Sequence, residues 1–331
     1  MKNLLTDVAG VRVGHADDRA LGSGVTAVLF DKPAVAAIDV RGGGPGIRDG
    51  ALLDPVNVVE KVDGIALSGG SAFGLEAGGG VQAWLAEQGR GFRIREAVVP
   101  IVPGAICFDL LNGGNKQWGR FAPYRDLGYP AAAAASTSFA LGSVGAGLGA
   151  TVANLKGGLG SASAKTEDGV CVGAIAVVNA VGATTIGDGP WFWAAPFEIG
   201  AEFGGRGMPA SFTPDMLKMR LKGGAAANAS ENTTLAVVVT DAALTKPQAQ
   251  RLAMIAQTGF ARAIYPVHAP LDGDVVFAAA TGERPIDPLI GVTELGMVAA
   301  NVVARAIARG VFAATALPFP GALPAWTDRF G

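Results

Sequence analysis

The sequence has few of the residues that build disulfide frameworks and metal sites. Cysteine occurs twice and histidine twice in 331 residues. Cys107 and Cys171 each lie in an apolar stretch, where a buried, inert thiol is the usual role. No Cys/His spacing resembles a zinc site, so we expect no metal. A Ser-His-Asp triad would have to use His15 or His268, and we expect both to be structural.

Charge and long apolar runs are also scarce. Charged residues make up 16% of the chain, the formal net charge is −2, and no run of Lys and Arg occurs. Such a chain has no electrostatic footprint for nucleic acid or an anionic membrane. The amino terminus has acidic residues where a secretory signal would be apolar, and no uninterrupted apolar stretch reaches the roughly 20 residues that span a bilayer. We expect a soluble, cytoplasmic protein with no nucleic-acid or membrane partner.

Glycine, in contrast, is abundant, with 49 residues. This level suggests tight turns and close backbone packing, as in layered sheets covered by helices. Residues 145–150, GAGLGA, fit a dinucleotide-binding pattern but follow SFALGSV, a poor first strand. Residues 160–166, GSASAKT, resemble a phosphate loop but carry Lys165 in place of the second glycine. We favour neither interpretation and expect no cofactor.

Apolar periodicity predicts alternating strands and helices. Thr245 is expected to cap one helix, and Thr293 and Gly310 are expected to begin and end another. No internal repeat is present, and no linker within residues 1–224 separates a second domain. The pattern therefore indicates a single α/β layered domain over residues 1–331. The predicted strands are 26–30, 36–40, 64–67, 171–179, 233–240 and 274–280, and the predicted helices are 71–88, 245–258 and 294–309.

Two aspartates are expected to lie near the start of strand 233–240. If a right-handed helical crossover joins this strand to strand 274–280, the two strands are parallel and their first residues lie at the same end of the sheet. Thr233 is then close to Asp272 and Asp274, a hydroxyl beside two carboxylates. Spacing alone favours a simpler interpretation, in which the aspartates form a solvated turn.

The junction before this strand indicates chemistry. Residues 223–232 are small and polar, as in an exposed linker, and the apolar strand follows without a turn. A threonine hydroxyl is a weak nucleophile that needs an adjacent base, and its own α-amino group, with a pKa of about 7.7 to 8.0, is one solution. Cleavage of the Asn232–Thr233 bond would create that group. An exposed linker that ends at a rigid strand can be cut without unfolding the core.

The sequence resembles the family of DmpA aminopeptidases, β-peptidyl aminopeptidases and nylon-oligomer hydrolases, which are related in architecture to the ornithine acetyltransferases. The resemblance implies a four-layer αββα sandwich. It also implies a precursor that cuts itself into subunits 1–232 and 233–331 and assembles as a homotetramer. The motifs that carry it run nearly end to end: LTDVAGVRVGHADD (5–18), IDVRGGGPGIRD (38–49), LSGGSAFGLEAGGGV (67–81), VPIVPGAICFD (99–109), LKGGLGSAS (155–163), AVVNAVG (176–182), NTTLAVVVTD (232–241) and DGDVVFAAATG (272–282).

The resemblance also assigns catalytic roles. Thr233 matches the nucleophile and Asn232 the residue before the cleaved bond, as in the nylon-oligomer branch. Asp272 and Asp274 match the acidic pair of that branch, and we expect them to titrate as a coupled pair with one pKa raised. Asn179 matches the asparagine that donates to the developing oxyanion.

Three further positions concern the substrate. Lys156 matches a site lysine, although a solvated surface charge is the simpler interpretation. Phe108 stands where the family has an active-site tyrosine, so that hydroxyl is missing. Ile106 stands where aminopeptidase members carry an acid that holds the free amine of the substrate. These departures favour a small peptide or amide oligomer with a less charged end.

Three functions stay open. The first is an amide hydrolase in which Thr233 attacks the substrate, Asn179 stabilises the oxyanion and water resolves the acyl-enzyme. The second is an acyltransferase with the same nucleophile, in which an amine takes the acyl group. The third is a homologue that keeps the fold but is never processed, an outcome that Phe108 makes conceivable.

Overall fold

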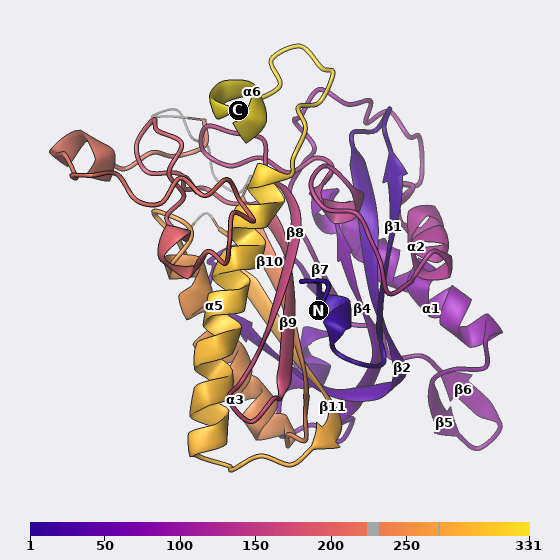
Figure 1. Ribbon diagram of the computed structural model, residues 1–331. Coiled ribbons are helices and arrows are strands. Elements are labelled where there is room, and N and C mark those ends of the chain that lie inside the picture. Colours follow the sequence, from indigo (N-terminus) through magenta and orange to yellow (C-terminus); the bar gives the residue numbers. More distant parts are fainter. Residues whose placement is uncertain (224–231, 271) are drawn as a thin grey trace.

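The computed structural model describes residues 1–223, 232–270 and 272–331. A mixed sheet of nine strands runs through the molecule in the order β3-β7-β4-β2-β11-β10-β9-β8, and β1 pairs with β2 (Figure 1). Its strands are β1 (Val11–Asp18), β2 (Ser23–Val40), β3 (Ile47–Arg48), β4 (Lys61–Ser68), β7 (Gly104–Ile106), β8 (Gly158–Lys165), β9 (Cys171–Asn179), β10 (Thr233–Ala242) and β11 (Val275–Arg284). A separate hairpin consists of β5 (Phe92–Ile94) and β6 (Ala97–Val99).

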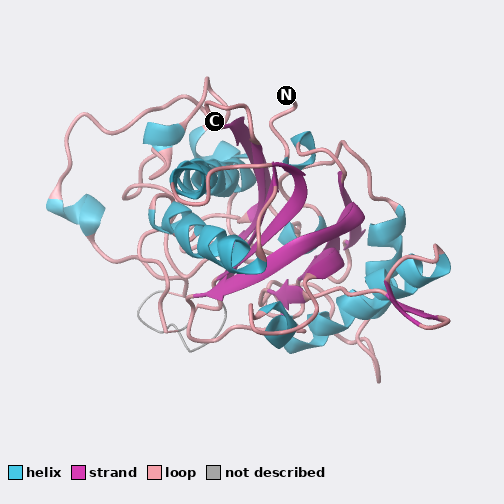
Figure 2. Ribbon diagram, turned by 90° about the horizontal axis from the view of Figure 1, so that it is seen from below, coloured by secondary structure: helices cyan, strands magenta, loops and turns pink. Residues whose placement is uncertain are grey.

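Helices cover both sides of the sheet, as Figure 2 shows from below. On one side lie α3 (Lys246–Ala256), α4 (Thr258–Ala261) and α5 (Ile290–Phe312). On the other lie α1 (Ala77–Glu87) and α2 (Tyr124–Ala133). The carboxyl-terminal helix α6 (Trp326–Phe330) follows a loop from α5.

The long strand β2 folds the sheet back on itself. Its first part pairs with β1 and β4 and its last part with β11, with a register shift between Leu29 and Ala34. The two halves of the sheet therefore face each other and share this strand. The prediction of separate strands 26–30 and 36–40 is wrong, because the exposed residues 31–33 interrupt the apolar pattern without ending the strand.

Alternation along β10 shows the layers directly. Leu235 and Val237 point into a core between the two halves of the sheet, where they meet residues of β2 and β4. Ala236 and Val238 point into a second core, beneath α3 and α5. A third core lies between β2, β4 and the helices α1 and α2. Three cores separate four layers, so the predicted αββα sandwich is confirmed.

Helix α5 is the longest helix among the described residues. By length and composition it could cross a bilayer, but most of it is buried here against β8, β9 and α3. It begins before the predicted cap Thr293, whose hydroxyl instead donates to the carbonyl of Leu289. It also continues past Gly310, the predicted end. This glycine has no side chain and packs closely against the backbone of Gly160 in β8.

The other predicted helices differ in how closely they match. In α3 the hydroxyl of Thr245 accepts from the N–H of Gln248, which confirms the expected cap. The predicted helix 71–88 is instead a 3₁₀ helix, Ser71–Glu76, followed by α1. Gly74 in that first segment packs against the carbonyl of Gly69, where a side chain would not fit.

Candidate active site

Thr233 is the first residue of β10 and lies in the interior of the sheet. Its β-branched neighbours continue as a buried strand, and its side chain is itself only 3% exposed. The strand pairs with β9 in antiparallel register, which places Thr233 opposite Asn179. The Thr233 hydroxyl donates to the carbonyl oxygen of Asn232, the residue before it. The hydroxyl is therefore in contact with the carbonyl group of the residue before it.

The acidic pair lies beside this threonine. Strands β10 and β11 are parallel, as predicted, so the turn that precedes β11 lies next to the start of β10. Asp272 and Asp274 are each 1% exposed, which rules out a solvated turn. Asp274 accepts from the N–H of Thr234 at 2.8 Å. It also accepts from His268, through Nδ1 at 2.9 Å and the backbone N–H at 3.2 Å.

Asp272 is held on the other side of the same turn. Its carboxylate accepts from the N–H groups of Val181 at 3.2 Å and Ala269 at 3.3 Å. Burial, and secondly the nearby charge of Asp274, raises the pKa of Asp272 to about 7. One carboxyl of the pair therefore stays protonated at a pH where an exposed aspartate is ionised.

A glycine-rich loop, residues 41–46, packs against the acidic turn. The N–H of Gly44 donates to the carbonyl of Asp272 at 2.8 Å, and the N–H of Arg41 donates to the carbonyl of Asp274 at 3.0 Å. A side chain on Gly42 would collide with the backbone of Asp272 and Asp274. The glycines of this motif therefore allow two backbones to meet and hold the turn in place.

Asn179 lies opposite Thr233 in the sheet, and both ends of its side-chain amide form hydrogen bonds. Its Nδ2 donates to the carbonyl of Phe108 at 3.0 Å. Its Oδ1 accepts from the N–H of Thr151 and from Nζ of Lys222, both at 3.0 Å. The amide thus connects β9 to the wall of a neighbouring pocket.

Lys156 is buried rather than solvated, being 1% exposed. Its Nζ donates to the carbonyls of Gly147 at 3.1 Å, Ala150 at 2.7 Å and Gly157 at 2.8 Å. Burial lowers the pKa of Lys156 to about 7. These bonds tie together three backbone segments beside the pocket, so the interpretation as a surface charge is wrong.

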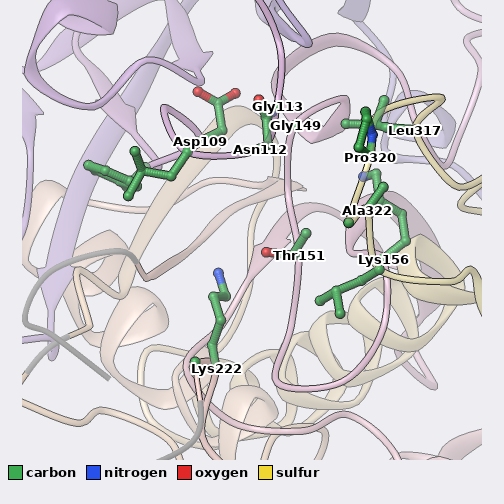
Figure 3. A pocket seen from close by; sticks show the side chains of 15 residues that line it. Asp109, Asn112, Gly113, Gly149, Thr151, Lys156, Lys222, Leu317, Pro320 and Ala322 are labelled. Atoms are coloured by element: carbon green, nitrogen blue, oxygen red, sulfur yellow. The ribbon is translucent and has the colours of Figure 1, made fainter. Parts of the chain in front are cut away.

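A pocket of 430 Å³ lies beside this cluster (Figure 3). Asp109, Thr151 and Lys222 line it, and Figure 3 shows the amine of Lys222 pointing toward the side where Asp109 lies and the Asp109 carboxylate pointing away from Lys222. Residues 317 and 320–323, between α5 and α6, form a largely apolar wall. Phe108 also lines the pocket. Ile106 does not: it is buried in β7 and packs against Gly46 and Gly74.

Sequence reasoning missed several residues of this site. Asp109 follows Phe108 in the motif of residues 99–109. Only the fold shows that its carboxylate is buried and accepts from Ser23 Oγ at 2.6 Å and Gly70 N–H at 2.8 Å. Burial raises the pKa of Asp109. The sequence predicts a structural role for His268, and the fold adds its hydrogen bond to Asp274. The predicted linker, apart from Gly223 and Asn232, lies outside the described residues. Within the described ranges, no group of three His, Cys, Asp or Glu residues could hold a metal ion.

Known proteins resemble the chain over nearly its whole length. The sequence profile of peptidase family S58 matches residues 3–322. An uncharacterized aminopeptidase of Mycobacterium tuberculosis is 44% identical, over 99% of this chain and 98% of that protein. A 6-aminohexanoate-oligomer endohydrolase of Kocuria sp. is 27% identical, over 92% and 85%.

Solved structures share the fold at lower identity. A beta-aminopeptidase of Burkholderia sp. aligns with a TM-score of 0.72 and 22% identity, over 99% of this chain and 93% of that one. An L-aminopeptidase D-Ala-esterase/amidase of Ochrobactrum anthropi, described as a variant of the Ntn hydrolase fold, aligns with a TM-score of 0.71 and 19% identity, over 99% and 92%. In both, the match is to the mixed sheet flanked by helices.

Proposed function

The chain belongs to peptidase family S58, whose members are aminopeptidases and amide hydrolases, and we propose that its nucleophile is Thr233, released by cleavage of the Asn232–Thr233 bond. The single observation that supports this most strongly is the contact between the Thr233 hydroxyl and the Asn232 carbonyl. The buried acidic pair beside it, Asp272 and Asp274, can stabilise the positive charge of the ammonium that forms on the α-amine of Thr233 during turnover.

Self-cleavage proceeds by an acyl shift. The Oγ of Thr233 attacks the Asn232 carbonyl carbon, and a C–O bond forms while the C–N bond of the peptide breaks. The hydroxyl proton passes to the departing nitrogen, which becomes the α-amine of Thr233. Water then hydrolyses the ester, leaving a carboxylate on Asn232 and restoring the hydroxyl. Asp274 holds the N–H of Thr234 and so fixes the backbone of the nucleophile during these steps.

In the processed enzyme the same hydroxyl attacks an amide bond of the substrate. The new α-amine of Thr233 accepts the hydroxyl proton and then protonates the departing amine. The ammonium that forms in between is stabilised by the neighbouring acidic pair. Water resolves the acyl-enzyme and releases the acid product.

The substrate class follows from the pocket and the relatives together. Relatives are named as aminopeptidases and as a hydrolase of 6-aminohexanoate oligomers, and both act on amide bonds near a chain end or in a short chain. The pocket combines an apolar wall with polar groups such as Thr151 and Lys222, which suits a short acyl chain with hydrogen-bonding amides. We therefore propose short peptides or amide oligomers as substrates.

Two measurements test this function. Intact mass after incubation should show fragments divided between residues 232 and 233, and Thr233→Ala should remain one chain. The purified protein should hydrolyse members of a panel of amino-acid p-nitroanilides, β-peptides and amide oligomers. An uncut chain that hydrolyses amides, or a Thr233→Ala chain that retains turnover, would contradict the proposal. Release of hydroxamate when hydroxylamine is added would distinguish acyl transfer from hydrolysis.

A further inference from the structure

A backbone N–H of the acidic turn points at the bond that would be cut. Gly273, between the two aspartates, donates to the carbonyl oxygen of Asn232 at 3.1 Å. This is the oxygen on which negative charge develops when Thr233 attacks. Resting on the function proposed above, we propose that the N–H of Gly273 is the oxyanion donor for acyl transfer at Thr233.

The turn is built so that this N–H is fixed in position. The carbonyls on either side of it, of Asp272 and Asp274, accept from the N–H groups of Gly44 and Arg41. An added Cβ on Gly273 would lie 2.6 Å from Thr233 Oγ and 2.8 Å from the carbonyl oxygen of Gly44. Only glycine allows the turn to approach the nucleophile this closely. A donor that is held before the reaction starts needs no reorganisation when charge develops.

The same donor serves an external substrate. Self-cleavage and substrate turnover pass through the same kind of ester, an acyl group on the Oγ of Thr233. In the first the acyl group is that of Asn232, and in the second it comes from the substrate. The carbonyl oxygen therefore returns to one position, and the Asn232 carbonyl of the uncut chain marks where it lies. In each tetrahedral intermediate the N–H of Gly273 donates to the negative oxygen, and it keeps its own proton.

The side-chain amide of Asn179, to which family resemblance assigns this role, also connects neighbouring segments. Its Nδ2 donates to the carbonyl of Phe108, and its Oδ1 accepts from Thr151 and Lys222. These bonds position the strand opposite the nucleophile and the pocket wall. Asn179 therefore has a positioning role in the uncut chain in addition to the role that family resemblance gives it, and the N–H of Gly273 contacts the carbonyl oxygen of Asn232.

Deleting this one N–H tests the assignment. Replacement of Gly273 by glycolic acid in cell-free translation exchanges the N–H for an oxygen and leaves the other atoms unchanged. The matched control is glycolic acid at Gly44, whose N–H bonds to Asp272 in the same turn but does not reach Asn232. The readout is the rate of cleavage between residues 232 and 233, followed by intact mass. We expect the change at Gly273 to slow cleavage about a hundredfold or more, as for loss of one oxyanion donor, and the change at Gly44 to slow it less than about tenfold.

Each result is decisive. Unchanged cleavage after the change at Gly273, or equal slowing by both changes, would overturn the assignment and leave self-cleavage itself standing. An unmodified chain that is never cut would instead overturn the proposed function. A second readout does not depend on turnover: in uncut Thr233→Ala protein with a ¹³C-labelled Asn232 carbonyl, glycolic acid at Gly273 should raise the infrared frequency of that carbonyl, and glycolic acid at Gly44 should not. An unshifted band would show that the hydrogen bond is absent.

Discussion

The two ends of strand β10 carry the same residue types in different surroundings. At its start stand Thr233 and, from the adjoining turn, Asp274; near its end stand Thr240 and Asp241. The hydroxyl of Thr240 donates to the carbonyl of Cys171 at 2.9 Å, and Asp241 accepts from the N–H of Cys171 at 2.8 Å. These side chains complete the hydrogen bonding at the end of the pairing between β9 and β10.

At the start of the strand the surroundings differ in burial and in what the hydroxyl meets. The Asp274 carboxylate is 1% exposed, whereas Asp241 is partly exposed. The Thr233 hydroxyl meets the carbonyl of the bond before it, whereas that of Thr240 meets a carbonyl of another strand. We propose that position and burial make Thr233 and Asp274 reactive, and the following changes test that contrast.

Removal of the proposed nucleophile should have the largest effect. Thr233→Ala deletes the attacking oxygen, so we expect cleavage and amide turnover to fall by roughly a thousandfold or more, the scale of losing a catalytic nucleophile. Intact mass and a p-nitroanilide assay measure the two effects. Thr240→Val, which removes the hydroxyl at the other end, should leave both rates unchanged. Equal loss in the two variants would mean that the strand, and not the hydroxyl, is what matters.

Neutralising the buried aspartate should come next. Asp274→Asn leaves one acceptor oxygen for the three N–H groups of Thr234 and His268 that now meet the carboxylate. We expect cleavage to slow about a hundredfold. Asp241→Asn keeps the oxygen that accepts from Cys171 and should cleave at the original rate. Equal slowing of cleavage by Asp274→Asn and Asp241→Asn would show that the two ends of the strand do not differ in function.

His268 should affect the rate of cleavage through its hydrogen bond to Asp274. Its φ of +54° lies in the left-handed region, where asparagine is among the best tolerated residues, and asparagine also carries an N–H donor at the place of Nδ1. We expect His268→Ala to slow cleavage about tenfold, the equivalent of one hydrogen bond to a charged group, and His268→Asn to recover most of that loss. Equal cleavage rates in His268→Ala and His268→Asn would show that the hydrogen bond from His268 does not support Asp274.

The protonated carboxyl of the pair should appear in the pH dependence of stability. The pKa of Asp272 is about 7 in the folded chain against 3.8 without its surroundings, so the folded state binds more protons between these values. This contribution to stability is present below about pH 4 and is lost as pH rises through about 7. In uncut Thr233→Ala protein, the free energy of unfolding in urea should therefore carry a component that falls from pH 5 to pH 8. The component should be missing when Asp272→Asn is added, and an unchanged pH slope would contradict the raised pKa.

The smallest effect on cleavage is expected at the far end of the strand. Thr240→Val removes the donor to the buried carbonyl of Cys171 and the acceptor of the N–H of Ala242, which should lower the free energy of unfolding by about 2 kcal/mol. Urea denaturation measures it. A loss of cleavage instead of stability would show that the two ends are coupled.

Much of this fold could be predicted because it depends on local pattern. The β-branched run after Thr233 identified a buried strand, and the parallel crossover brought Asp272 and Asp274 to its start. The course of β2 could not be predicted, because only its partners in the folded sheet carry the strand across residues 31–33. The contact of His268 with Asp274 likewise depends on a left-handed backbone that no local pattern specifies. Asp109 and Lys222 join the pocket only when distant segments pack together.

The place of β10 and β11 in the sheet decides what a cut before Thr233 would do to the molecule. Both strands lie in the middle of the ladder, between β9 and β2, which belong to the other fragment. The pieces would thus be interlocked by backbone hydrogen bonds on two sides. Cleavage of the chain would leave the two fragments in a single particle. The fragment that carries the new amine would not dissociate on dilution or exchange between molecules. Maturation would then be a one-way event that each molecule completes for itself.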